Sequence, residues 1–238
     1  MDFTTAAGAE RLSAVEVRSY GQYCPIARAS EILAMRWTPI IVRNLLLGCE
    51  TFSEIQDGAP GIPRTLLSQR LRLLEQHGIV ERHPGRGGRG SRYTLTDAGE
   101  ELLGVCDALG AWGARWLEMA PAHMDAGVVL WSLCRLADPD ELPTRRTVIR
   151  FDLLDGPRRR FWVLLQKPAP EVCVKPPGYD EDLVVTASSE WLAKWHMGKI
   201  SLARAMHEGL IEVQGPRALV RRLARLGLSR YASVTTAA

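Results

Sequence analysis

The segment from residue 60 to residue 95 limits what this chain can fold into more than any other part of its sequence. It reads PGIPRTLLSQRLRLLEQHGIVERHPGRGGRGSRYTL. Leucines recur in its first half at helical spacing beneath a polar face, and Gly78 ends the helix. Two short strand-like runs follow, at residues 79–83 and 91–95, around a loop that has four glycines in seven residues. A helix, a strand, a flexible loop and a second strand in this order predict a winged helix-turn-helix.

Positive charge gathers in the same segment. The 238-residue chain has a formal net charge of only +3, yet residues 60–95 hold seven arginines against two glutamates. Residues 1–121 as a whole carry 13 basic and 14 acidic side chains, so residues 60–95 are a positively charged segment within a nearly neutral N-terminal part of the chain. Such a distribution is typical of phosphate binding, and double-stranded DNA is the expected partner. A solvated arginine-rich face without a partner is the alternative.

The polar face of the helix predicted over residues 63–77 carries side chains suited to base edges and phosphates. Arginine pairs with guanine, glutamine with adenine, and serine or threonine with either base. The candidate contacts on this face are Arg64, Thr65, Ser68, Gln69 and Arg72. In the loop, Arg86 and Arg89 can enter a minor groove or hold phosphates, and Arg92 follows on the second strand. Because any amphipathic helix has a polar outer face, the order of the elements carries this prediction.

Three helices are expected before this segment and one long helix after it. The first three cover residues 26–35, residues 39–48 with Thr38 as N-cap, and a short stretch started by Thr51 or Ser53. The fourth runs from a cap at Thr96 to about residue 117, and its apolar residues recur at spacings of 3, 4, 3 and 4: Leu102, Val105, Leu109, Trp112 and Trp116. Two heptads of this kind favour pairing with a twin helix in a homodimer, and packing on its own domain is the alternative.

Residues 20–115 resemble the HxlR-type winged-helix transcription regulators. The matching pieces, in complete order, are Cys24-Pro25, ILAMRWTPIIVRNLLLG, FSEIQ, IPRTLLSQRLRLLEQHGIVERH and SRYTLTDAGEELL. The resemblance implies a homodimer that binds operator DNA, often as a repressor and sometimes as an activator. The loop between the strands departs from the family pattern, because it is rich in glycine where many relatives carry prolines and acids.

The pattern changes after residue 121. A helix is expected over residues 124–136, followed by a hairpin that turns at Asp155-Gly156, two further strands, two short helices, a last strand and a last helix. This order predicts an α+β layer of about five strands with helices on one side. We therefore expect an α+β protein with a short N-terminal arm (residues 1–19), a DNA-binding and dimerisation domain (20–120) and an effector-binding domain (121–238).

Residues 145–228 resemble the sterol-carrier-protein-like domain. The features are a strand, a short helix, Gly198, another helix, and then Gly209, Ile211, Val213 and Gly215 before a final helix. The resemblance implies an apolar cavity for a hydrophobic small-molecule effector, and no catalytic residue. Apolar and aromatic side chains that could line it are Trp131, Ile149, Phe151, Trp162, Leu164, Trp191, Trp195 and Met206. The alternative is that these side chains simply fill a core.

Several classes of protein are disfavoured. The five cysteines are widely spaced and form no CxxC, which indicates a reduced cytoplasmic protein without disulfides and with no expected metal or cofactor. The sequence has no G-x-S-x-G, P-loop, H-E-x-x-H or Rossmann motif, so an enzymatic or lipid-binding C-terminal half is the least favoured hypothesis. No apolar run reaches the ~18 residues of a transmembrane helix, and the charged N-terminus does not resemble a secretory signal.

Cys24 supports an alternative function. It stands in a Cys-Pro pair just before the first predicted helix, with Arg28 one turn further on. A thiol in such a position can react with oxidants or electrophiles, and some members of the resembled family sense these compounds there. Cys24 therefore marks a possible redox or electrophile sensor, and a small packing residue is the ordinary interpretation.

Overall fold

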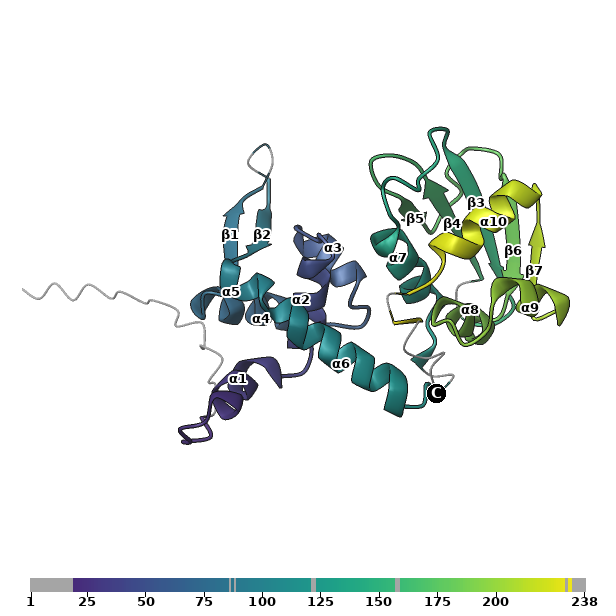
Figure 1. Ribbon diagram of the computed structural model, residues 1–238. Coiled ribbons are helices and arrows are strands. Elements are labelled where there is room, and N and C mark those ends of the chain that lie inside the picture. The colour runs from purple at the N-terminus through teal and green to yellow at the C-terminus, as the bar shows by residue number, and fades with distance from the viewer. Residues whose placement is uncertain are drawn as a thin grey trace, which may run out of the picture.

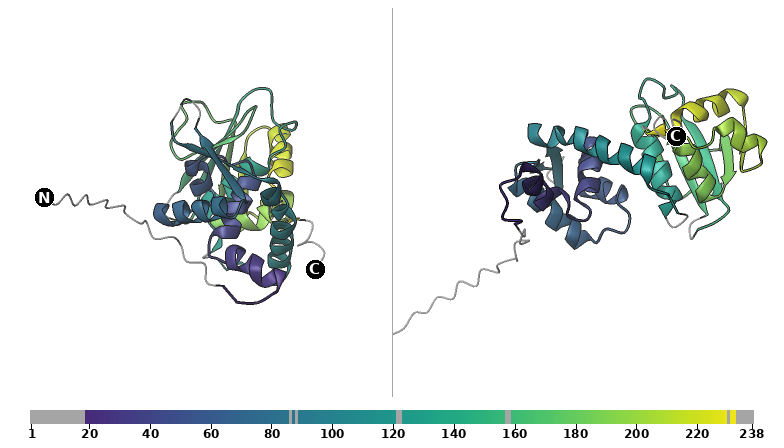
Figure 2. Two further views of the ribbon diagram at one scale, coloured as in Figure 1. Left: turned by 90° about the vertical axis from the view of Figure 1, so that its left-hand side faces the viewer. Right: turned by 60° about the horizontal axis from the view of Figure 1, so that its bottom comes forward.

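The computed structural model describes residues 19–85, 87, 89–120, 123–156, 159–229 and 231–232, so residues 1–18 of the expected N-terminal arm lie outside the described residues. The described chain forms an N-terminal region (residues 19–120) of helices and a two-stranded sheet, and a C-terminal region (residues 123–232) with a five-stranded sheet. Helix α6 runs between the two regions (Figures 1 and 2). The predicted α+β class is confirmed.

The N-terminal region begins with the four expected helices, which are α1 (Pro25–Leu33), α2 (Thr38–Leu46), α3 (Phe52–Asp57) and α4 (Arg64–Gln76). Thr51 begins α3 through a capping box, because its hydroxyl accepts from Glu54 N at 3.3 Å and the Glu54 carboxylate accepts from Thr51 N at 2.9 Å. The expectation that Thr38 caps α2 was wrong. Trp37, in a left-handed conformation (φ 79°), precedes the helix, and Thr38 is buried within its first turn.

The leucine face of α4 is confirmed as its buried side. Leu67, Leu71 and Leu74 are almost fully buried against Ile41 of α2 and Ile55 of α3. Burying such side chains contributes about 1.5–3 kcal/mol each, so the leucines hold α4 in one rotational setting about its axis. Its polar residues are therefore turned away from the core by the same packing.

The two predicted strands follow as β1 (Val80–Pro84) and β2 (Ser91–Leu95), paired antiparallel with Val80 opposite Leu95. Gly78 ends α4 in a left-handed conformation (φ 66°). The long helix expected after them is α5 (Asp97–Glu100) and α6 (Leu102–Trp116), separated at Glu101, which keeps helical torsions. Thr96 caps this helix as expected, since its hydroxyl accepts from Gly99 N at 3.2 Å.

The C-terminal region is one mixed sheet covered by helices on one face (Figure 1). The strand order is β5-β4-β3-β6-β7, where only the β3–β6 pairing is parallel. The strands are β3 (Thr147–Leu153), β4 (Arg160–Leu165), β5 (Glu171–Cys173), β6 (Leu183–Ala187) and β7 (Ile211–Gln214). The helices are α7 (Ala126–Leu136), α8 (Ser189–His196), α9 (Leu202–His207) and α10 (Arg217–Leu226). The five expected strands and the one-sided helix layer are confirmed.

Side chains of β3 alternate between the two faces of this sheet. Ile149 and Phe151 face the helices and form the main core with residues such as Leu133 of α7 and Trp195 of α8. Val148 points to the opposite face, where it forms a small cluster with Trp162 and Leu164. Within the described residues, no helix has the length and apolar composition needed to cross a membrane.

Candidate nucleic-acid interface and a cavity between the regions

The predicted DNA contacts on α4 lie on its surface side. Arg64, Thr65 and Arg72 are exposed, and Ser68 and Gln69 are half-buried. They occupy the side of the helix opposite the buried leucines. None of these five side chains is fully buried, so the side of α4 that carries them is accessible to solvent.

Two arginines of α4 are fixed by their neighbours. Arg64 donates from Nη1 to Gln56 Oε1 at 3.0 Å, and its guanidinium lies 4.8 Å from the centre of the Phe52 ring. Arg70, which was not among the predicted contacts, donates from Nε to the carbonyl oxygen of Arg36 at 3.3 Å. Burial lowers the pKa of Arg70. Arg64 is therefore held at the start of the polar face of α4, and Arg70 connects α4 to the chain between α1 and α2.

The loop between β1 and β2 is only partly described. Arg86 lies outside the described residues, and Arg89 is exposed. Arg92 on β2 forms an ion pair with Glu50 at 3.4 Å. Such a partly exposed pair is worth about 0–1 kcal/mol, so a DNA phosphate can compete for the arginine. The three arginines stay predictions as DNA contacts, and Arg92 has a structural partner that the sequence did not indicate.

The apolar seam predicted on α6 is largely exposed. Val105, Leu109, Trp112 and Trp116 are 43 %, 53 %, 56 % and 68 % exposed, respectively. Leu102 differs, because it is half-buried and packs against the N-terminal core. Tyr23 and Ile26, near the start of α1, are also large apolar side chains with high exposure.

The eight side chains predicted to line an effector pocket are not brought together. Ile149, Phe151 and Trp195 are buried in the main core, while Trp162 and Leu164 lie on the other face of the sheet. Trp191 and Met206 are half-buried against the core. Only Trp131 lines the cavity described next. The expectation of one pocket from these residues is corrected, because the strand alternation separates them onto two faces.

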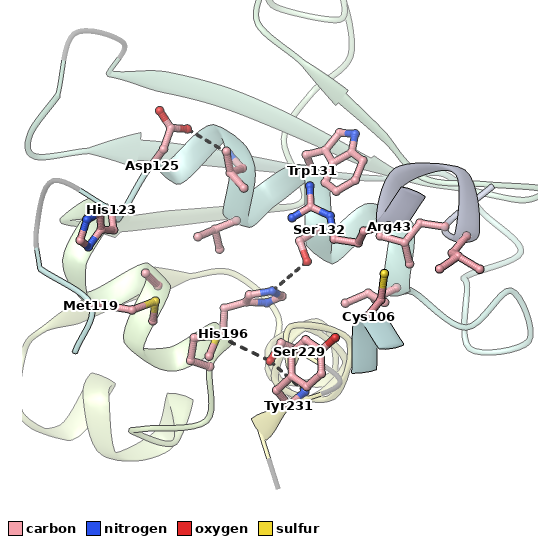
Figure 3. A pocket seen from close by; sticks show the side chains of 17 residues that line it. Arg43, Cys106, Met119, His123, Asp125, Trp131, Ser132, His196, Ser229 and Tyr231 are labelled. Atoms are coloured by element: carbon pink, nitrogen blue, oxygen red, sulfur yellow. Dashed lines mark hydrogen bonds between the residues drawn. The ribbon is translucent and has the colours of Figure 1, made fainter. Parts of the chain in front are cut away.

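A cavity of about 290 Å³ lies between the two regions (Figure 3). Its walls come from α2, α6, α7, α8 and the segment around Ser229 and Tyr231, and most of the lining is apolar. The polar side chains among the lining residues are Arg43, His123, Asp125, Ser132, His196, Ser229 and Tyr231. The cavity thus joins side chains that are far apart in the sequence.

Trp131 packs the C-terminal region against the N-terminal region beside this cavity. It belongs to α7 but packs in the core of the N-terminal region. Gly58 makes room for it, since a Cβ at this position would overlap the Trp131 ring and lie 2.6 Å from Asn44 Nδ2. Arg135, one turn further along α7, donates to the Glu54 carboxylate at 3.2 Å. The same α7 therefore contributes to both cores.

Arg43 carries a cation at the cavity wall. Its Nε and Nη2 donate to Asn44 Oδ1 at 3.0 and 2.8 Å, and Nη2 also donates to the Gly58 carbonyl at 2.6 Å. Its guanidinium lies 5.3 Å from the centre of the Trp131 ring. In Figure 3 it extends from α2 toward Trp131 and Ser132. Burial lowers the pKa of Arg43, and it has no carboxylate partner among the described residues.

His196 and Ser132 form a neutral hydrogen-bonded pair on the cavity wall. His196 Nδ1 lies 2.5 Å from the Gly227 carbonyl, which only accepts, so Nδ1 carries the proton. Nε2 then accepts from the Ser132 hydroxyl at 3.1 Å. Burial lowers the pKa of His196 and outweighs the opposing effect of the Gly227 carbonyl. The sequence carried no signal for this pair, because the two residues are 64 positions apart.

The cysteines differ in their surroundings. Cys24 is the half-buried N-cap residue of α1, and its side chain makes no capping hydrogen bond. Burial raises the pKa of Cys49 to about 11 and that of Cys134 to about 12, so neither is a thiolate at neutral pH. Of these three, only Cys24 has both partial exposure and a position at a helix start.

The buried leucines of α4, its exposed polar face and the antiparallel hairpin define a winged helix-turn-helix protein. The model of the HxlR-like helix-turn-helix family matches residues 32–121. The HTH-type transcriptional regulator YvaP of Bacillus subtilis is 36 % identical over 107 residues, which are 44 % of this chain and 96 % of YvaP. The chain belongs to the HxlR-like helix-turn-helix family, and it is a transcriptional regulator with a DNA-binding domain of that type.

Two solved structures extend the comparison. The reduced form of the transcriptional regulator YodB from B. subtilis has 33 % identity and a TM-score of 0.36, and it covers 41 % of this chain and 97 % of YodB. The ubiquinone synthesis protein UbiJ-SCP2 has 20 % identity and a TM-score of 0.32, and it covers 52 % of this chain and 92 % of its own.

Proposed function

We propose that this regulator is a homodimer that binds a specific operator and represses transcription, and that a small effector bound by the C-terminal half (residues 121–238) changes its affinity for DNA. The observation that carries the proposal is the exposed polar face of α4. Thr65 and Arg72 are exposed and Gln69 is half-buried, on the side of α4 that faces away from its buried leucines. This is the arrangement a reading helix needs to enter a major groove.

Within this proposal, side chains of α4 contact bases and arginines of the loop between β1 and β2 contact phosphates. Arg64, already oriented by Phe52 and Gln56, loses little side-chain entropy when it meets a base or phosphate. Thr65, Ser68, Gln69 and Arg72 provide the remaining base contacts. Arg89, together with Arg86, holds backbone phosphates at the flank, and these contacts supply affinity without sequence preference.

The exposed seam of α6 supports the homodimer. Four large apolar side chains on one helix face are costly to leave in water, and a second copy of the same helix offers a matching surface. A two-fold dimer presents two α4 helices to groove segments about 34–36 Å apart. We expect Leu109→Glu to yield a monomer of half the dimer's mass by light scattering, while the matched surface change Leu154→Glu leaves the dimer intact. A dimer that survives Leu109→Glu contradicts this interface.

The operator is found by selecting bound duplexes from a random-sequence pool with the full-length protein. We expect a two-fold symmetric consensus, and affinity that falls by about 10³-fold or more between about 50 and about 200 mM salt if six or more phosphates are contacted. Fluorescence anisotropy on the selected duplex measures this. Failure to enrich any consensus, or affinity indifferent to salt, would remove α4 as a reading helix.

A second candidate is regulation through the thiol of Cys24, which is partly exposed at the start of α1. Oxidation or alkylation there would alter the start of α1, where Tyr23 precedes the helix and Ile26 lies in its first turn, both with exposed side chains. Under this alternative, the thiol oxidant diamide changes DNA affinity in the unaltered chain but not in Cys24→Ser. An identical response of both proteins to diamide retires the alternative.

A further inference from the structure

We propose that the cavity between the two regions binds a small organic carboxylate, with its apolar body among the aliphatic walls and its anionic head against Arg43. The inference deepens the proposed function by naming the effector class and its site. Only the effect of the ligand on DNA affinity rests on the proposed function, because binding of the carboxylate itself requires no DNA.

The size and lining of the cavity set the body of the ligand. About 290 Å³ is near the lower end of the range for small-molecule sites, which suits a compact molecule of one or two rings or a short acyl chain. The walls include Leu46 at the end of α2, Leu47 directly after it, and Val128 and Val129 from α7. Surfaces of this kind favour an apolar body over a sugar or a nucleotide.

The charge of Arg43 sets the head of the ligand. Its partners among the described residues are all neutral: the Asn44 amide oxygen, the Gly58 carbonyl and the Trp131 ring. These bonds use Nε and Nη2, whereas Nη1 makes no hydrogen bond to any described residue. A partly buried guanidinium without a counter-ion is electrostatically unfavourable, and a carboxylate at Nη1 would supply both the missing charge and acceptors.

The other polar groups at the cavity do not replace that anion. Asp125 is engaged as the N-cap of α7, where its carboxylate accepts from Val128 N at 3.0 Å. His123 Nδ1 accepts from Ala120 N at 3.2 Å. His196 is neutral, and the Ser132 hydroxyl that donates to it keeps lone pairs for a donor on the ligand. The hydroxyls of Ser132, Ser229 and Tyr231 line the same wall, and Arg43 supplies its guanidinium cation.

The position of the cavity gives the ligand a route to the DNA-binding surface. It is lined by α2 and α6 of the N-terminal region and by α7 and α8 of the C-terminal region. Tyr231, also in the lining, packs on Gly110 of α6, where a Cβ would overlap its ring. A ligand that fits only one relative arrangement of these helices would stabilise that arrangement. It would thereby change the fraction of the protein whose arrangement can bind the operator.

The test uses the full-length protein without DNA and titrates it by calorimetry with 2-naphthoate and with its neutral analogue 2-naphthamide. We expect the carboxylate to bind at least about tenfold more tightly than the amide. Arg43→Gln should abolish this preference. The matched control Arg146→Gln, a surface change where the guanidinium lies over Tyr179, should keep it. Val128→Phe, which fills the cavity while leaving Arg43 in place, should weaken both compounds.

Equal affinities for 2-naphthoate and 2-naphthamide, or no binding of 2-naphthoate, overturn the proposal in the unaltered chain, so this arm does not depend on how the variants fold. A carboxylate preference that persists in Arg43→Gln overturns it as well, and so does undiminished binding by Val128→Phe. Because none of these titrations contains DNA, their failure is separate from a failure of operator selection.

Discussion

The face of α4 and the cavity between the regions are built in opposite ways. The α4 face comes from one continuous helix, and its side chains point outward because leucines bury the other side. The cavity brings together Arg43, Ser132 and His196 from three helices of two regions. A surface site can follow from the period of a single element, whereas a cavity between regions depends on which elements meet.

The largest expected effect concerns Trp131, which belongs both to the N-terminal core and to the cavity wall. We expect Trp131→Ala to lower the free energy of unfolding by about 3–5 kcal/mol, because it removes a large side chain from the N-terminal core and the cavity wall together. Urea denaturation measures the loss. Trp191→Ala, at a half-buried ring beneath Lys194, should cost clearly less. Equal losses of unfolding free energy in the two variants would show that packing of Trp131 into the N-terminal core adds no stability beyond that of an ordinary half-buried ring.

Gly58 offers a sharper test of the same packing. Gly58→Ala should cost about 1–3 kcal/mol, because the new methyl group overlaps Trp131 and approaches Asn44. Gly104→Ala on α6 is the matched control, since nothing lies within 4 Å of a Cβ there and alanine favours a helix by up to about 1 kcal/mol. Thermal denaturation of both variants measures the difference, and the midpoint should fall in Gly58→Ala but not in Gly104→Ala. A stable Gly58→Ala protein would mean that Trp131 can move without cost.

On the α4 face, Arg72→Ala should weaken binding to the selected operator by about 1–3 kcal/mol if Arg72 reads a base, and fold stability should hardly change because this side chain is exposed. Fluorescence anisotropy with the selected duplex and with a scrambled duplex distinguishes a base contact, which is lost only on the selected duplex, from a phosphate contact. Arg145→Ala, at a side chain that is 90 % exposed in the C-terminal region, is the control. A uniform loss on both duplexes would instead mark Arg72 as a phosphate contact.

The smallest effect is a pH dependence from the cavity wall. Burial lowers the pKa of His196 in the folded protein, so the unfolded chain takes up its proton first as the pH falls. The contribution of His196 to stability is therefore complete above its unfolded value of about 6.5 and declines below it. Urea denaturation at about pH 7.5 and about pH 5.5 should show a smaller decline in His196→Asn than in the exposed-site control His207→Asn. The same slope in both variants would contradict a buried neutral imidazole.

Much of the fold followed from local patterns. The helix over residues 63–77, the hairpin after it and the five strands beyond residue 145 were predicted from apolar periods and glycines, and all were found. The cap at Thr38 was wrong because Trp37 adopts a left-handed conformation that no propensity scale favours. The surface positions of the α4 contacts also followed from its period, since a helix with one leucine face has only one side left for solvent.

The cavity could not be predicted in the same way. Trp195 and Phe151 looked suitable as lining but fill the core, while Arg43 sits in an apolar helix where it attracted no attention. Its importance comes from what surrounds it: a ring from α7, a carbonyl at Gly58 and no carboxylate partner among the described residues. Both of these neighbours, Trp131 and Gly58, lie far from Arg43 along the chain.

The sequence alone determined which face of each helix and strand is buried, because apolar side chains leave water wherever their spacing permits and that spacing is a local property. It therefore determined the leucine-packed helix α4, the hairpin after it and the layered C-terminal region. Only the tertiary structure decided that α7 would insert Trp131 beside Arg43 and leave a space next to it. Contacts between distant segments depend on shape and charge complementarity in three dimensions, and no period along the chain records them.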